Sequence, residues 1–174
     1  MERKNAWLSY GEADETAMEK LAKDYRAFLD AGKTERECVT ELVREAEANG
    51  YVNLETKLAA GEKIQPGDKV YAVGMKKIMA LFHVGQEPLE KGMNILGAHI
   101  DSPRLDVKQN PLYEDTDLAY LDTHYYGGVK KYQWVAIPLA IHGVIVKKDG
   151  SVVDVVIGED ENDPIVYITD LLIH

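Results

Sequence analysis

The spacing of the apolar residues changes near Pro66, and this change most restricts the folds open to the chain. Ahead of it, one apolar stripe recurs with the period of a helix face: Leu21, Tyr25, Phe28 and Leu29. Gly32 is a typical end for this helix, and the capping-box sequence Thr34-x-x-Glu37 predicts the start of a second one. We therefore expect a helical hairpin over the residues up to Gly50.

From the turn sequence Pro66-Gly67-Asp68 onward, the pattern favours strands. The expected strands span residues 70–73, 78–84, 93–100, 104–108, 118–126, 152–157 and 165–168, and residues 135–147 form a further long apolar run. Residues 93–100 are apolar on both faces, which is typical of a strand inside a covered sheet. Asp149-Gly150 is a hairpin signal. The expected class is α/β, with β-rich character after Pro103.

The composition excludes some partners. The formal net charge of −10 argues against nucleic acid and against an anionic membrane surface, because both attract basic proteins. No apolar run approaches the roughly 20 residues that span a bilayer, and the N-terminus lacks the apolar core of a signal peptide. The single cysteine, Cys38, is expected to be a small buried apolar residue. We expect a cytoplasmic protein.

The candidate chemistry lies where the apolar run from Ile95 ends in His99-Ile100-Asp101. A carboxylate near an imidazole fixes its tautomer and orients it toward a metal ion. The alternative is a histidine at a strand end whose ring is satisfied by neighbouring backbone. A catalytic triad with Ser102 is disfavoured, because residues this close in sequence do not easily converge. The chain has no His-Glu-x-x-His motif and no Glu-Glu pair.

Other polar features have plainer interpretations. His142 lies within an apolar run and is expected to be a hydrogen-bonded core histidine. The short acidic stretch Glu159-Asp160-Glu161 is expected to be solvated surface rather than a cation site.

Three segments resemble the aspartyl aminopeptidase family of co-catalytic zinc exopeptidases, in the family's order. Residues 97–108, Gly-Ala-His-Ile-Asp-Ser-Pro-Arg-Leu-Asp-Val-Lys, resemble its first metal-binding segment. Tyr126-Gly127-Gly128 with Trp134 resembles a downstream segment, and Ile168 to His174 resembles a third. The resemblance implies an α/β peptidase domain over residues 1–103, followed by a β-rich inserted dimerisation domain that starts at residue 104 and runs to 174.

The resemblance also implies roles for single residues. His99 would be a ligand of one of two zinc ions, and Asp101 would be the catalytically important carboxylate that orients it. His174 would be a substrate-binding histidine lent across a dimer contact to a neighbouring subunit. The implied substrates are peptides, which lose their N-terminal residue, and the implied assembly is a homo-oligomer.

Family members are considerably longer, and their remaining metal ligands lie downstream of the segments found here. We therefore expect this chain to be a truncated N-terminal part that is inactive alone and holds no zinc stably. We also expect it to self-associate through the apolar strand at Ile95, or to be ordered mainly in its β-rich part. The rival interpretation is a β-rich dimerisation or binding module without chemistry of its own.

Overall fold

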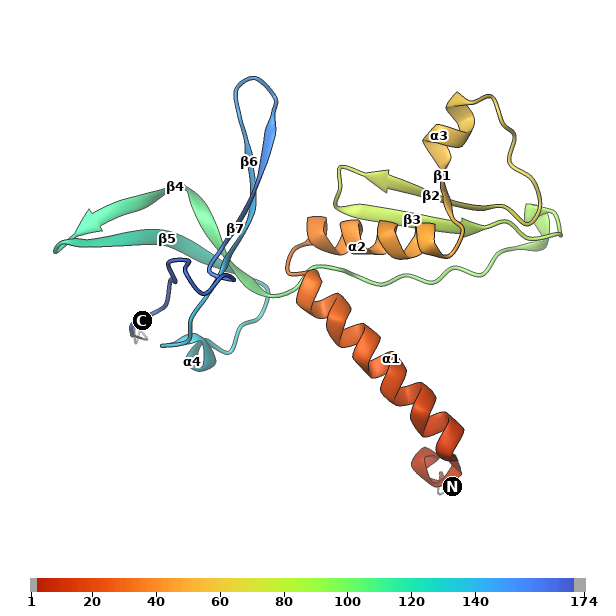
Figure 1. Ribbon diagram of the computed structural model, residues 1–174, viewed down its shortest axis with the longest axis horizontal. Helices are drawn as coiled ribbons and strands as arrows, with labels where there is room; N and C mark the ends of the chain where they lie inside the picture. Colours follow the sequence, from red (N-terminus) through yellow and green to blue (C-terminus); the bar gives the residue numbers. More distant parts are fainter. Residues whose placement is uncertain (1–2, 171–174) are drawn as a thin grey trace. The chain divides into compact units, whose positions relative to one another are not determined.

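The computed structural model describes residues 3–170 of the 174-residue chain. The chain divides into two compact units, Met1–Ile100 and Asp101–His174. Helices and small sheets both occur, so the predicted mixed α/β composition is confirmed (Figure 1). Among residues 3–170, no helix combines the length and apolar character needed to cross a membrane.

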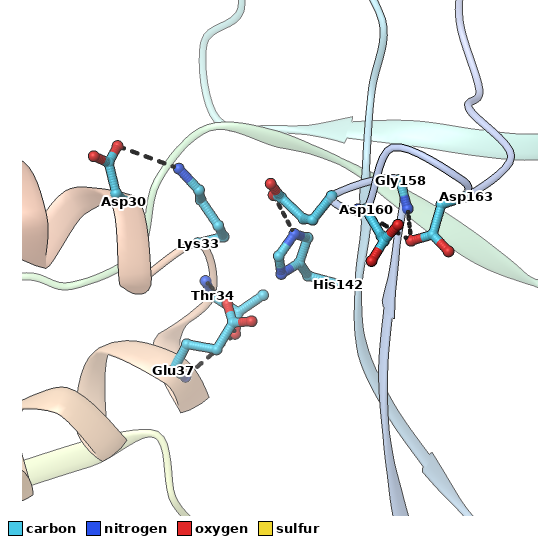
Figure 2. Close-up of polar contacts among 9 residues, drawn as sticks. Asp30, Lys33, Thr34, Glu37, His142, Gly158, Asp160 and Asp163 are labelled. Carbon is cyan, nitrogen blue, oxygen red and sulfur yellow. Dashed lines mark hydrogen bonds and ion pairs between the residues drawn. The ribbon is translucent and has the colours of Figure 1, made fainter.

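The first unit begins with helices. A 3-10 turn, η1 (Ala6–Ser9), precedes α1 (Glu12–Ala31) and α2 (Glu35–Ala48), and a short α3 (Leu54–Ala59) follows. The predicted helix signals are confirmed: α1 ends at Gly32, and α2 starts with a capping box. In that box the Thr34 hydroxyl accepts from the Glu37 N–H, and Glu37 Oε2 accepts from the Thr34 N–H at 2.8 Å (Figure 2). Side-chain oxygens thus satisfy N–H groups that the first turn leaves unpaired.

One three-stranded sheet completes the first unit, and α2 lies along it (Figure 1). The strand order is β1 (Val52–Asn53), β2 (Lys69–Gly74), β3 (Ile78–His83), with β2 parallel to β1 and antiparallel to β3. The buried apolar residues of the described chain all belong to α2 and β2: Cys38, Val39, Ala46, Val70 and Tyr71. The predicted burial of Cys38 is confirmed, and the core sits between α2 and the central strand.

The expected strand over residues 93–100 is wrong. After β3 and the short 3-10 turn η2 (Leu89–Lys91), the chain runs to Ile100 without regular secondary structure. Ile95 and Leu96 are 82% and 98% exposed. A strand needs a neighbour whose backbone completes its hydrogen bonds, and residues 93–100 have no strand partner among the described residues. Apolar character alone therefore overpredicted a strand here.

The second unit consists mainly of two hairpins. β4 (Arg104–Asp115) pairs antiparallel with β5 (Leu118–Tyr126), with a register shift between Val107 and Leu112. Pro111 lies in that interval and has no N–H to give to the ladder. β6 (Ile141–Val146) pairs with β7 (Val152–Ile157) across the predicted Asp149-Gly150 turn.

Two expectations for the second unit need correction. Of the apolar run 135–147, only Ile141–Val146 is a strand. The expected strand 165–168 is reduced to isolated bridges, Leu139 with Val166 and Val135 with Ile168. A short helix, α4 (Lys131–Trp134), lies between β5 and β6. Pro138 and the left-handed backbone of Ala136, with φ of 60°, interrupt the run and keep it from extending as one strand.

Candidate functional site

His99 lies in the irregular end of the first unit. Its side chain is exposed, and the residue stands one position before the last residue of that unit, Ile100. The ring is therefore not presented by the end of a strand, as the sequence had suggested, but by a segment without regular structure.

Asp101 opens the second unit, and a tyrosine holds its carboxylate. The hydroxyl of Tyr126 donates a hydrogen bond to Asp101 Oδ2 at 2.9 Å. Tyr126 is the last residue of β5, whereas Asp101 precedes β4. The antiparallel register pairs Arg104 with Tyr126 and thereby brings the two side chains to one end of this hairpin.

The ring of Tyr126 is itself held by charged neighbours. The guanidinium carbon of Arg104 lies 4.2 Å from the ring centroid, within the range of a cation–π contact. Arg104 Nε donates to Asp106 Oδ1 at 2.7 Å, and both side chains are about one third exposed or less, at 29% and 31%. Asp106 therefore fixes the guanidinium, and the guanidinium covers the tyrosine.

Gly127 lets the chain turn directly after Tyr126. Its φ is +72°, in the left-handed region that residues with a Cβ rarely adopt. An added Cβ would lie 3.5 Å from the Cα of Pro103, which is an ordinary van der Waals distance. The end of β5 thus passes close to Pro103, and the Asp101–Pro103 and Tyr126–Gly128 stretches meet.

The second and third family-like segments also come together within this unit. The N–H of Ala136 donates to the carbonyl of Ile168 at 2.8 Å, next to the bridge between Val135 and Ile168. Trp134 and Ile168 both line an apolar pocket of about 130 Å³. The remaining lining residues are Leu105, Tyr125, Val129, Lys131 and Val135. All three segments therefore have members around the β4–β5 hairpin and this pocket.

His142 forms a separate polar contact in the β6–β7 hairpin. Its Nε2 lies 2.9 Å from Glu159 Oε1, and its side chain is 12% exposed (Figure 2). The predicted hydrogen bond is confirmed, although the residue is half-buried rather than part of a core. Within the adjoining acidic loop, Asp163 Oδ2 accepts from the N–H of Gly158 at 2.8 Å (Figure 2). Asp163 thus stabilises the loop backbone.

The described residues do not by themselves fit a catalytic zinc ion. Such an ion normally takes three protein ligands. Nowhere in residues 3–170 do three histidine, cysteine, aspartate or glutamate side chains gather closely enough to hold a metal. His99 is one nitrogen donor, and no catalytic step follows from it alone. His174, the expected substrate-binding residue, lies outside the described residues.

Sequence reasoning missed the Tyr126–Asp101 hydrogen bond. Both residues belong to segments singled out by the family resemblance, but they are 25 positions apart. The alternating pattern of β4 and β5 predicts two strands without giving their register. The contact could have been found by trying the possible registers of the two strands, because the register that pairs Arg104 with Tyr126 brings Tyr126 and Asp101 to the same end of the hairpin.

Comparisons with known proteins agree on one family. A family model described as aminopeptidase I zinc metalloprotease (M18) matches residues 28–174. A probable M18 family aminopeptidase 1 from Clostridium acetobutylicum is 59% identical over 173 residues, and one from Thermotoga maritima is 46% identical over 174 residues. These matches cover 99% and 100% of this chain. The chain spans about 37% of the length of both relatives.

Solved structures give the same result. The crystal structure of aminopeptidase I from Borrelia burgdorferi matches with a TM-score of 0.88 at 38% identity, over 97% of this chain and 41% of that one. Aminopeptidase I from Clostridium acetobutylicum matches with a TM-score of 0.82 at 59% identity, over 100% of this chain and 38% of that one.

Proposed function

Because the chain belongs to the M18 family of aminopeptidase I zinc metalloproteases, we propose that it supplies the first metal-ligand segment of an enzyme that removes N-terminal residues from peptides. The single observation that carries this proposal is the family match over residues 28–174, which includes His99 and Asp101. The coverage of about 37% of the relatives means that the remaining machinery would come from sequence beyond the part matched here.

In this proposal His99 donates one zinc ligand, and Asp101 is the carboxylate that orients it. Two features support these roles. His99 is an exposed residue on a segment without regular structure. Asp101 is held by Tyr126, as expected for a carboxylate whose direction matters more than its burial.

The wider assembly also belongs to the proposal. A β-rich dimerisation domain starting after Pro103, a homo-oligomer, and two zinc ions in the complete site are features that the family resemblance implies. His174 would serve substrate binding across the dimer contact. A cytoplasmic location, expected from the sequence, likewise stays a proposal.

The test joins this chain to the region of the Clostridium acetobutylicum relative that extends beyond the match. Zinc per chain is measured after desalting, and hydrolysis of amino-acid anilides is measured on the same sample, for the joined protein and for the 174-residue chain. We expect zinc and activity in the joined protein, and loss of most of both in its His99→Ala variant. The matched control is His124→Ala, because His124 is also an exposed histidine and its ring contacts only backbone in its described hydrogen bond.

Retention of full zinc content and activity by the His99→Ala variant would show that His99 is not a ligand. A folded joined protein that dimerises but contains no zinc and hydrolyses no anilide would favour the rival, non-catalytic module.

A further inference from the structure

We infer that Tyr126 is a positioning residue that fixes the direction of the Asp101 carboxylate. This inference rests on the proposed function, because it gives a purpose to Asp101 only if that carboxylate serves a metal-binding histidine. It goes further by assigning a role to the tyrosine of the Tyr126-Gly127-Gly128 segment, for which the comparisons name none.

The hydrogen bond has the right polarity for this role. A phenol, with a pKa of about 10, keeps its proton at neutral pH, and an ionised carboxylate can only accept hydrogen bonds. The O–H of Tyr126 therefore donates to Oδ2 of Asp101, at 2.9 Å. A carboxylate offers about four lone-pair sites on two oxygens, so this bond restricts its rotation without using all of its capacity to accept.

The tyrosine is rigid enough to position a partner. Arg104 lies over its ring at 4.2 Å, and Arg104 is directly opposite it in the β4–β5 ladder. Asp106 holds Arg104 in turn through the 2.7 Å bond to Nε. Because each side chain in this series is fixed by the next, the orientation of Asp101 is set by the hairpin rather than by its own rotamer preference.

The backbone around the contact is equally constrained. Gly127 adopts a φ of +72° and passes against Pro103, two residues after Asp101. The hydroxyl of Tyr126 and the carboxylate of Asp101 are thereby attached to two chain segments that already touch. The alternative is a simple structural role, in which the bond only joins the ends of the hairpin. The test has to distinguish this role from the positioning of Asp101.

The first measurement uses the 174-residue chain as it stands. The ¹³C chemical shift of the Asp101 carboxyl carbon is compared between the unsubstituted chain and Tyr126→Phe, which removes the hydroxyl alone. The matched control is Tyr120→Phe, on the same strand, whose ring stacks on Tyr113. We expect the Asp101 carboxyl shift to change in Tyr126→Phe and to stay in place in Tyr120→Phe. An unchanged shift in both variants would overturn the inference.

The second measurement uses the protein joined to the relative's remaining region. It distinguishes a tyrosine that positions Asp101 from one whose bond only joins the ends of the hairpin. Loss of a group that orients a metal ligand typically lowers metal affinity or activity by about 10- to 100-fold, and Tyr126 acts on such a group, Asp101, rather than on the ligand itself. We therefore expect Tyr126→Phe to lower zinc affinity, measured by competition with a chelator, by about 10-fold, the lower end of that range, and to lower kcat more than it raises KM. Tyr120→Phe should leave both within about twofold.

If Tyr126→Phe lowers only the melting temperature and leaves zinc affinity at the level of Tyr120→Phe, the bond only stabilises the hairpin and the inference is wrong. Its failure differs from failure of the proposed function. In the first case the unsubstituted joined protein binds zinc and is active; in the second case that protein itself lacks both zinc and activity, and the inference falls with it.

Discussion

The two units of this chain are stabilised in different ways. In the first, α2 covers a three-stranded sheet, and the pair encloses the buried apolar residues of the described chain. In the second, no described residue is buried, and two hairpins are held by register, turns and polar contacts. A two-stranded hairpin is at best marginally stable in water without a covering layer. The family-like segments downstream of Ile100 therefore lie in the part of the chain that opens most easily.

This difference bears on function. Loops and segments that bind ligands are commonly drawn from the less stable parts of a protein, because they must adjust when the ligand arrives. Asp101 and Tyr126 belong to such a part, whereas the core of α2 and β2 contains no residue of the candidate site. The core of the first unit provides stability, whereas the candidate site residues lie outside it, with His99 at the end of the first unit and Asp101 and Tyr126 in the second.

Deleting methyl groups gives the largest expected difference between the two units in the loss of unfolding free energy. Val70 is 3% exposed in β2, and we expect Val70→Ala to lower the free energy of unfolding by about 2 to 3 kcal/mol, from lost burial and the cavity left behind. Val152 is 54% exposed in β7, and the same change there should stay within about 0.5 kcal/mol. Urea unfolding followed by far-UV circular dichroism measures both. Equal effects would mean that the hairpins acquire a core in solution.

A glycine substitution tests whether the β6–β7 hairpin holds its described geometry. Gly158 has a φ of +100°, and an added Cβ would lie 3.1 Å from the Cα of Ala140. We expect Gly158→Ala to destabilise the hairpin by about 2 kcal/mol, from backbone strain and crowding. Amide hydrogen exchange of β6 and β7 measures the loss.

The matched control is Gly143→Ala, because nothing lies within 4 Å of a Cβ added at Gly143 in β6. Its exchange rates should differ little from those of the unsubstituted chain. If Gly158→Ala also left the exchange rates unchanged, the described turn at Gly158 would not be populated. The difference in stability between the two units would then be larger than described.

The capping box of α2 gives a smaller effect in the stable unit. Thr34→Ala removes the hydroxyl that accepts from the Glu37 N–H, and we expect a loss of about 1 kcal/mol in the free energy of unfolding. Thr40→Ala, within the same helix, removes a hydroxyl that only donates to the carbonyl of Arg36. Thermal and urea unfolding should show Thr40→Ala as the milder change. A larger loss from Thr40→Ala would contradict the importance assigned to the cap.

The smallest effect is the pH response of the β6–β7 turn. Bonds from the Ser151 hydroxyl and from the Ser151 N–H lower the pKa of the Asp149 carboxyl below its usual 3.8. A lowered pKa in the folded state means that the carboxylate stabilises the turn above pH 3.8, and that this contribution is lost as pH falls through the folded pKa. NMR titration of Asp149 measures it. Ser151→Ala should raise the pKa part of the way back, whereas an unmoved pKa would show that the hydroxyl bond does not form.

Local chemistry was readable from the sequence. The end of α1 at Gly32, the capping box at Thr34, the Asp149-Gly150 turn, and the strands β2, β3, β5 and β7 all follow from rules that act over a few residues. A helix cap or a tight turn depends on side chains and φ angles within a few consecutive residues. The amino acids at those positions are therefore enough to predict the cap or the turn. The family match was equally accessible, because the three segments occur in order.

The tertiary structure decided the pairings between distant residues. Residues 93–100 have a strand-like pattern, yet they form no strand, because a strand needs hydrogen bonds from a neighbour that the pattern does not supply. The contact between Tyr126 and Asp101 likewise depends on the register of β4 against β5, which includes a shift between Val107 and Leu112. A strand pattern repeats every two residues and is compatible with several registers; the one adopted is set by the turn, by Pro111 and by the packing of Arg104 on Tyr126. For that reason the sequence singled out candidate residues for the chemistry, and only the folded chain showed which of them meet.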